Sequence, residues 1–471
     1  MYLLAQDIRV MEGFGHKDYI DHTVVHPLGL AIVVACGLAL LLVPRKYAVW
    51  PFIVIVCFVA PAQRIVVLSL DFNFLRLLVI FGCLRLIGRG EARGFVWKPI
   101  DLLVVAWALV SSVANVVLAG TGATLIYRCG WLYDVLGMYF LFRCLIRDWS
   151  DLRMLFIGLA LASIPVAAGF LVENATGRNL FAFFGGVPEI TPVREGRVRC
   201  RGAIGNAIGA GCFWAGIAPL VASLWWAAPR WKPLAATGTI MCVVIIYCCA
   251  SSTPVLTLMA TAVGGAAFFV RRHARTIRWG LLLGAVGLHL MMKAPIWHLL
   301  SRISAVGGST GYFRYLLIDH FIRRIGEWWL LGTKSTAHWF PGAQDLTNWY
   351  VYQGVTGGLG ALLLFVALIA VAYGNTGRIW RAVERDSGRL ALAWAVAVSL
   401  LAHTVSFIGV SYTGSTGSLF WLLGLAMIGS FAPAARHTAS SHRQHAGRRG
   451  GTGEPCASRP QWTALTSRIG P

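Results

Sequence analysis

Charged side chains are scarce in this chain of 471 residues. They make up 13% of it, whereas a soluble globular protein carries about 25%. Acidic residues are the rarer kind, and the formal net charge is +22. Hydrophobic residues make up 57% and gather in blocks close to the length of about 20 residues that a helix needs to cross a bilayer. The scarcity of charge therefore excludes an ordinary soluble domain and indicates a protein with many membrane spans.

Metal-binding and targeting patterns are also missing. The 11 cysteines form no CxxC pair, and no cluster of His, Cys or carboxylate residues has the spacing of a metal site, so we expect neither a metal nor another cofactor. The first 26 residues mix acidic and basic side chains, unlike a cleavable signal peptide. Because the apolar blocks do not alternate with polar residues, we expect helices rather than the strands of a membrane barrel.

The apolar blocks predict an all-α fold, a polytopic transmembrane helical bundle of about 13 spans. The expected spans are 28–43, 47–60, 74–88, 101–119, 130–146, 154–172, 203–227, 234–250, 254–270, 279–292, 353–374, 390–411 and 416–432. Together they make one transmembrane domain, residues 1–432. Residues 433–471 are rich in Gly, Ser, Arg and His, so we expect a disordered basic tail there.

Basic residues mark one side of this bundle. Arg and Lys follow each odd-numbered span up to the eleventh, as at Arg45 and Lys46 after the first. Cytoplasmic loops carry an excess of positive charge, so these loops are expected in the cytoplasm, with the N-terminus outside and the C-terminus inside. The same rule accounts for the net charge of +22 without nucleic acid as a partner.

Two long external loops, 173–202 and 293–350, are basic on the side where positive charge is disfavoured. In the first loop Arg197, Arg199 and Arg201 alternate, which in an extended segment places them on one face. Planar arginine forks bind phosphate oxygens through paired hydrogen bonds, so the loops predict an anionic substrate. Anchoring of the arginines to lipid headgroups is the alternative.

The second loop contains a segment, 311–326, whose apolar residues have helical spacing. We expect an amphipathic helix there, lying along the outer surface of the membrane and carrying Arg314. Three tryptophans fit a belt at the membrane interface, with stacking on sugar rings as the alternative; they are Trp328, Trp329 and Trp339. Polar residues, Thr347 and Asn348 among them, then lead into the Gly-rich eleventh span.

Several of these segments resemble the O-antigen ligase and polymerase superfamily of bacterial inner-membrane glycosyltransferases. One is Arg199-Cys-Arg-Gly202-Ala-Ile-Gly205-Asn206, which looks like the family's Arg-x-x-Gly-x-(aromatic or aliphatic)-Gly-(Asn/His)-Pro segment with Ala207 in place of the proline. Another is Arg314 followed by Leu331-Gly332, which looks like the arginine and glycine motif at the head of the family's large periplasmic loop.

Two further segments carry the resemblance. Thr347-Asn348 followed by Gly358 has the spacing of the family's His-Asn and glycine motif. The turn Cys249-Ala-Ser251-Ser252-Thr253 is similar to a Ser-rich turn in the family.

The resemblance implies a glycan ligase or polymerase with a large periplasmic loop that carries amphipathic helices. Its substrates would be a polyprenyl-pyrophosphate-linked glycan donor and a glycan acceptor, used among membrane lipids. Arg199 and Arg314 would stabilise the leaving pyrophosphate. The expected substrate-binding residues are Arg197, Arg201, Lys334, Thr347 and Asn348.

Thr347 is the main departure from the family, because it stands where ligases have a histidine that is thought to activate the acceptor. Threonine cannot act as a base near neutral pH. An unperturbed histidine has a pKa of about 6.5, which suits a general base. His338 is the nearest substitute, and its rivals are Asp319, Glu327 and Asp345. The departure argues against a standard lipid A ligase and favours a divergent, exopolysaccharide polymerase-like branch.

Two non-enzymatic interpretations compete with this one: a flippase or transporter of lipid-linked glycans, and a scaffold subunit of a polysaccharide export complex. Transporters commonly show internal repeats and charged residues near the membrane midplane. The chain shows no convincing repeat, and its charges cluster in the external loops, which favours chemistry at the outer face.

Overall fold

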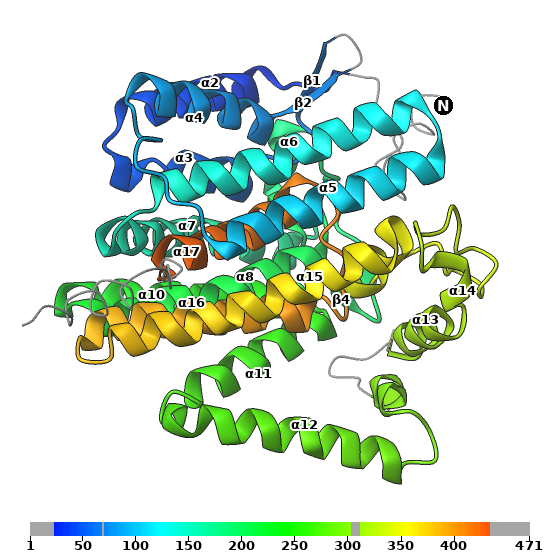
Figure 1. Cartoon of the computed structure of the whole chain (residues 1–471). Helices are drawn as coiled ribbons and strands as arrows, with labels where there is room; N and C mark the ends of the chain where they lie inside the picture. The colour runs from blue at the N-terminus through cyan, green and yellow to red at the C-terminus, as the bar shows by residue number, and fades with distance from the viewer. Residues whose placement is uncertain (1–22, 68–69, 303–310, 434–471) are drawn as a thin grey trace, which may run out of the picture. The chain divides into compact units, whose positions relative to one another are not determined.

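The structure, a computed structural model, describes residues 23–67, 70–302 and 311–433, and these are mostly helical (Figure 1). The expectation of a helical fold is therefore confirmed, with four short strands added within these residues. Of the tail expected at residues 433–471, all but the first residue lies outside them.

The elements follow one another along the chain with short connections. The α-helices are α2 (Pro27–Leu42), α3 (Trp50–Phe58), α4 (Phe74–Gly88), α5 (Pro99–Ala119), α6 (Gly122–Leu145), α7 (Trp149–Thr176), α8 (Ala207–Ala222), α9 (Leu224–Ala227), α10 (Lys232–Cys248), α11 (Ser252–Ala266), α12 (Ala274–Met291), α13 (Gly311–Arg323), α14 (Ile325–Trp328), α15 (Trp349–Ala382), α16 (Ser387–Ser406) and α17 (Ser415–Phe431). The 3-10 turns are η1 (Arg45–Tyr47), η2 (Leu180–Phe184), η3 (Gly202–Ile204), η4 (Pro229–Trp231), η5 (Arg271–His273) and η6 (Ile296–Arg302). Two antiparallel hairpins pair β1 (Arg64–Val67) with β2 (Leu70–Asn73) and β3 (Val193–Arg194) with β4 (Arg197–Val198).

Among the described residues, six helices are long and apolar enough to cross a membrane: α5, α7, α8 continued by α9, α10 with the turn before it, α15 and α16. The other expected spans are helical too, but several are short. Helix α3 has nine residues. A helix of that length is about 14 Å long, half of the roughly 30 Å hydrocarbon core. The count of thirteen spans therefore goes beyond what helix length and composition support.

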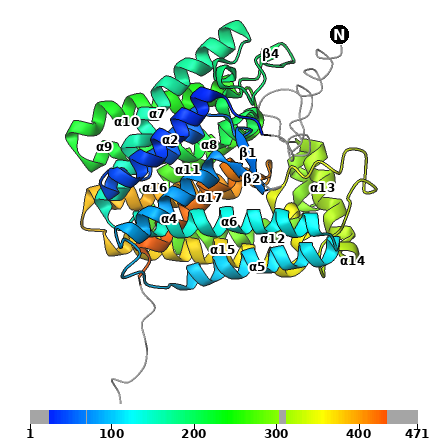
Figure 2. The ribbon, with the colours of Figure 1, turned by 90° about the horizontal axis from the view of Figure 1, so that it is seen from above.

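Helix α8 lies at the centre of the packing, where it contacts α10, α11 and α16 (Figure 2). Helix α5 packs along α15 on another side of the bundle. Large aromatic side chains fill the interior, and Trp107, Trp214 and Trp421 are each at most 2% exposed. Burial of so much apolar surface among the helices fixes their order and holds the connecting loops in place.

Helix α15 is interrupted at Gly358, where φ is 70° and ψ is −174°. The break frees two backbone groups, and the segment after α14 pairs with both of them. The Leu359 N–H donates to the Trp329 carbonyl at 2.8 Å, and the Thr333 N–H donates to the Val355 carbonyl at 2.8 Å. A side chain at Gly358 would overlap the Leu330 carbonyl. The glycine that resembled a family motif is therefore the place where the segment after α14, part of the basic loop 293–350, packs against α15.

Buried ion pairs connect the helices on the other side of the bundle. Arg143 in α6 donates to Asp101 in α5, which is fully buried, at 2.9 Å. Arg76 in α4 pairs with Asp134 in α6 at 2.8 Å. Arg76, Asp101 and Arg143 lie within the first or last turn of their helices, while Asp134 lies in the middle of α6. The expectation that charges cluster in the external loops is therefore wrong for these residues.

Candidate functional site

The turn between α10 and α11 is the point where both basic loops meet the bundle. It spans residues 249–253, which include the first two residues of α11, and Ala250 has a φ of 43°, a left-handed conformation that a side chain disfavours. On one side of the turn the Cys200 N–H donates to the Cys248 carbonyl at 3.1 Å, which attaches the first loop. On the other side Thr253, in the first turn of α11, contacts Arg314 of the second loop.

Arg199 lies half-buried in the first loop, beside this turn. Its Nε is buried and has no hydrogen-bond partner in the described part of the chain. Burial lowers the pKa of Arg199, and repulsion from Arg194 and Arg201 lowers it further. Its guanidinium therefore lacks a compensating anion, because no ion pair to it occurs among the described residues. An anionic ligand would supply that charge.

Glu173, near the end of α7, fixes the backbone of this arginine loop. Its side chain is fully buried and accepts from the Thr191 hydroxyl at 2.7 Å. It also accepts from the backbone N–H groups of Arg201 at 2.9 Å and Gly202 at 3.1 Å. Arg201 itself is half-buried, so burial lowers the pKa of its guanidinium, and the charge of Glu173 partly opposes that shift.

Arg314, in the first turn of α13, reaches the same region from the second loop. Its Nη2 donates to the Thr253 hydroxyl at 2.8 Å and to the Gly409 carbonyl at 3.5 Å. Its Nε is buried without a partner in the described part of the chain, and burial lowers the pKa of the group. Arg314 and Arg199 thus flank one turn, residues 249–253, each with an unused buried donor.

Thr347 and Asn348 lie next to this region at the start of α15. The Asn348 side chain caps the helix by accepting from the N–H groups of Tyr350 and Val351, and its amide donates to the Ile408 carbonyl at 3.2 Å. Asn348 therefore positions the helix, and its amide is already occupied within the protein. The Thr347 hydroxyl is buried and has no partner in the residues that the structure describes. Of the two, Thr347 is the one with a free hydrogen-bonding group.

A track of polar side chains leads from Arg314 into the bundle, and the sequence analysis missed it. The Thr257 hydroxyl donates to the Thr253 carbonyl at 2.9 Å and shares a 3.0 Å hydrogen bond with Ser406. Beyond Ser406, His403 Nδ1 lies 3.1 Å from the Tyr412 hydroxyl, and His403 is 2% exposed. The i, i+4 spacing of Thr253 and Thr257 at the start of an apolar span was the available signal.

His338 lies elsewhere. Its Nε2 is 2.8 Å from a Glu327 carboxylate oxygen, which also accepts from the Trp339 indole at 2.9 Å. Arg314 lies at the start of α13, whereas Glu327 lies in α14, beyond the end of α13. The pairing with Glu327 therefore keeps His338 near the end of α13 that is opposite to Arg314. None of the contacts of His338 among the described residues involves Arg199 or Arg314.

Two other expectations change with the structure. Trp328 and Trp339 are 2% and 4% exposed in a small core under the second loop, so they do not form an interfacial belt; Trp329 is 52% exposed. Arg197, on β4, and Lys334 are exposed, and the structure does not bring them to the turn. Arg197 and Lys334 therefore remain in the exposed parts of the two basic loops.

Comparisons with protein-family models and with curated proteins find no match for this chain. The resemblance to the O-antigen ligase and polymerase superfamily therefore depends on the quoted segments alone. Those segments do come together in space, because the turn at residues 249–253 contacts both arginine loops and Gly332 packs against the broken helix α15.

Proposed function

We propose that this chain is a membrane glycosyltransferase that transfers or polymerises glycan units from a polyprenyl-pyrophosphate-linked donor, in the synthesis of a bacterial cell-surface polysaccharide. One observation carries the proposal: Arg199 and Arg314 flank one turn, and each keeps a buried, unpartnered Nε. A buried guanidinium without an anion is costly, and a pyrophosphate held between the two groups would offset that cost.

The proposed reaction is the one that the resemblance implies, and it gives both arginines a role. A hydroxyl of the acceptor attacks the anomeric carbon of the donor, the new glycosidic C–O bond forms, and the C–O bond to pyrophosphate breaks. Negative charge grows on the pyrophosphate oxygens as that bond breaks, so two fixed arginines stabilise the transition state more than the ground state. The hydroxyl proton leaves to a base, and the leaving group departs as polyprenyl pyrophosphate.

Two histidines compete for the role of the base. His338 is exposed and is oriented by the Glu327 carboxylate, an arrangement that suits a general base, but it points toward the far end of α13 from Arg314. His403 is buried and contacts the Tyr412 hydroxyl. The polar track that begins at Arg314 ends at Ser406, which lies one turn from His403 in α16. Replacing each by alanine and measuring the pH profile of transfer separates them, since loss of the base removes the acidic limb of the profile.

The enzyme would work at the outer face of the bacterial inner membrane. The basic loops after the odd-numbered spans favour an N-terminus in the periplasm and a C-terminus in the cytoplasm. In that orientation the turn at residues 249–253 faces the periplasm, where lipid-linked glycans would meet their acceptors.

Transport of lipid-linked glycans is the rival function, and the buried ion pairs bear on it. Arg143 and Asp101 carry opposite charges close to helix ends, and Arg76 and Asp134 satisfy one another. Each of these four charges has an opposite partner, so the two pairs hold helices together and none of the four is left for a substrate pathway. This favours the enzyme over the transporter.

Reconstitution of the purified protein with a lipid-linked glycan donor tests the proposal. New glycosidic linkages are expected, and Arg199→Gln and Arg314→Gln should abolish most of them while protein levels stay normal. The control is Arg178→Gln in the same loop, because Arg178 is 73% exposed and pairs only with Glu189 among the described residues. Movement of the donor between leaflets without new linkages would contradict the proposal and support a flippase.

A further inference from the structure

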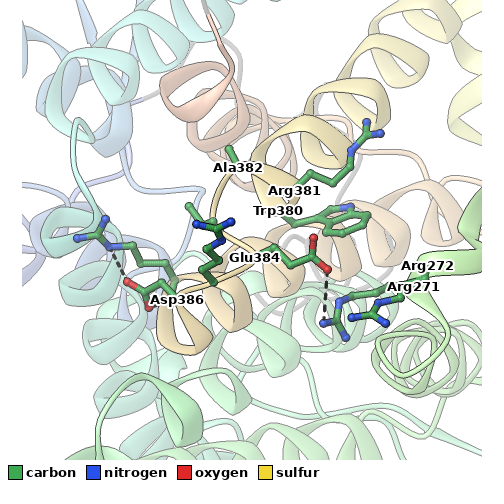
Figure 3. Close-up of a pocket in the computed structure, with 10 residues that line it drawn as sticks. Arg271, Arg272, Trp380, Arg381, Ala382, Glu384 and Asp386 are labelled. Carbon is green, nitrogen blue, oxygen red and sulfur yellow. Dashed lines mark hydrogen bonds and ion pairs between the residues drawn. The ribbon is translucent and has the colours of Figure 1, made fainter.

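A second group of arginines surrounds a cavity of about 880 Å³ between the connection after α11 and the connection from α15 to α16 (Figure 3). Its main lining residues are Arg271, Arg272, Trp380, Arg381, Arg385 and Arg389. The site at residues 249–253 lies at the start of α11, and this cavity lies beyond its end. Likewise α15 begins beside Asn348 and ends at the cavity. The two arginine clusters therefore occupy opposite ends of the same helices.

Positive charge is in excess around the cavity. Five arginines line it with two carboxylates, Glu384 and Asp386. Asp386 pairs with Arg389 at 3.1 Å, and Glu384 lies 4.0 Å from Arg271, both marked by dashed lines in Figure 3. The other three arginines have no carboxylate partner in the part of the chain that the structure describes.

Two of the guanidinium groups are held in place by the protein. Arg271 donates to the Phe268 carbonyl at 3.0 Å and stacks 4.3 Å from the Phe268 ring, while its Nε is buried without a partner among the described residues. Arg381 donates to the Gly377 carbonyl at 2.6 Å and lies 5.8 Å from the Trp380 ring. Groups that are already oriented lose less rotational freedom when a ligand binds.

An excess of arginine at loops is expected on the cytoplasmic side of any membrane protein. That rule requires positive charge near the membrane, and it does not require arginines from two connections, more than 100 residues apart, to share one cavity. Arg378 shows the difference, because it is exposed on the last turns of α15 and does not line the cavity.

We infer that this cavity binds a phosphate group, carried by the headgroup of an anionic lipid or by a soluble phosphorylated molecule. Arginine forks match the oxygens of phosphate, and the exposed rim of the cavity admits a ligand from water or from the lipid surface. The inference does not rest on the proposed transferase activity, since the two clusters lie at opposite ends of α11 and α15.

Binding measurements on the purified full chain in nanodiscs test this inference. Native mass spectrometry would count phosphatidylglycerol retained by the protein, and calorimetry in neutral lipid would measure binding of inorganic pyrophosphate. Arg271→Gln and Arg381→Gln should each weaken whichever ligand binds by roughly tenfold, the value of one lost charge-assisted hydrogen bond. Glu384→Gln should strengthen binding, because it removes the carboxylate nearest to Arg271.

The matched control is Arg378→Gln, which removes the same charge from the same helix outside the cavity. If Arg378→Gln retains binding, the ligand depends on the cavity and not on overall charge. If phosphatidylglycerol is retained and pyrophosphate does not bind, the ligand is a lipid headgroup. Pyrophosphate binding in neutral lipid that Arg271→Gln weakens, and that Arg314→Gln leaves unchanged, identifies a soluble ligand of the cavity. An equal loss in Arg378→Gln and Arg381→Gln would overturn the inference, as would the absence of binding to either probe, because both results reduce the cluster to general surface charge.

Discussion

The two arginine clusters differ in how their charges are compensated, although α11 and α15 join them. At the turn of residues 249–253, Arg199 and Arg314 are partly buried and have no carboxylate partner among the described residues. At the far ends of the helices, the arginines are mostly exposed and two of them face Glu384 and Asp386. A buried charge without a counter-ion is costly in free energy, so binding of an anion there is favourable. An exposed charge is largely solvated by water. The difference fits the two proposals made above, a transferase site at the first cluster and a phosphate-binding site at the second.

The largest expected effect comes from a substitution at Gly358, where the loop that carries Arg314 packs against α15. Gly358→Ala should cost about 4 kcal/mol of unfolding free energy, because the backbone conformation there is almost restricted to glycine and a side chain overlaps the Leu330 carbonyl. Thermal unfolding in detergent measures this cost. Gly360→Ala is the control in the same helix, since its side chain meets only Val110 at an ordinary distance of 3.5 Å. Equal melting temperatures for the two variants would rule out the role given to the break.

Removing one arginine of the first cluster should impair the reaction and leave the fold intact. Arg314→Gln is expected to lower transfer about 100-fold, in line with the loss of one preorganised donor to a transition-state oxyanion. Initial rates in reconstituted membranes measure this. Arg378→Gln, at the other end of α15, should change the rate by less than about twofold because it is exposed and screened. Similar losses in both variants would mean that overall charge, and not the cluster, drives the reaction.

Weakening the anchor of the arginine loop should have a moderate effect. Glu173→Gln replaces a buried carboxylate that accepts three hydrogen bonds with an amide whose NH₂ faces donors. A loss of about 2 kcal/mol in stability is expected, together with slower transfer. Glu189→Gln serves as the comparison, because the Arg178–Glu189 pair is exposed and should contribute at most about 1 kcal/mol. Proteolysis of the loop in Glu173→Gln, read by mass spectrometry, would locate the damage.

The smallest expected effect concerns pH. A hydrogen bond from the Trp339 indole is the main cause that lowers the pKa of Glu327 from 4.5 to about 2. Desolvation opposes this shift in part, and hydrogen bonds from Arg324 and His338 add to it. Because the folded pKa lies below the unfolded one, this carboxylate stabilises the fold above pH 4.5 and loses that effect as the pH falls toward 2. Solvent screening limits the change to about 1 kcal/mol. Melting temperatures from pH 6 to about 3 should fall less in Glu327→Gln than in the parent protein; parallel curves would contradict the assignment.

Helix positions were the most predictable feature, because apolar blocks of near-helical length leave little choice of structure. All the expected spans coincide with helices, and the segment after residue 311 folds into α13 as its periodicity indicated. The number of spans was less predictable. Short apolar helices such as α3 carry the same composition as full spans, and sequence alone does not distinguish them.

Site residues were harder to predict than helices, since they depend on contacts between distant segments. The resemblance assigned Arg199 and Arg314 to one pyrophosphate, but the sequence gave no sign that the turn at residues 249–253 would lie between them. It also gave no sign that Asn348 would be used as a helix cap or that His338 would pair with Glu327. His403 went unnoticed because a histidine inside an apolar span has no distinguishing neighbours in the sequence.

The central claim is that Arg199 and Arg314 act on one anion, and a double-mutant cycle on the transfer rate tests it most directly. Rates would be measured for the parent protein, Arg199→Gln, Arg314→Gln and the double variant at equal amounts of folded protein in the membrane. Two groups that stabilise the same leaving pyrophosphate are coupled, so the double variant should lose far less than the product of the single losses. Losses that simply multiply would show that the two arginines act independently, and would contradict a shared site.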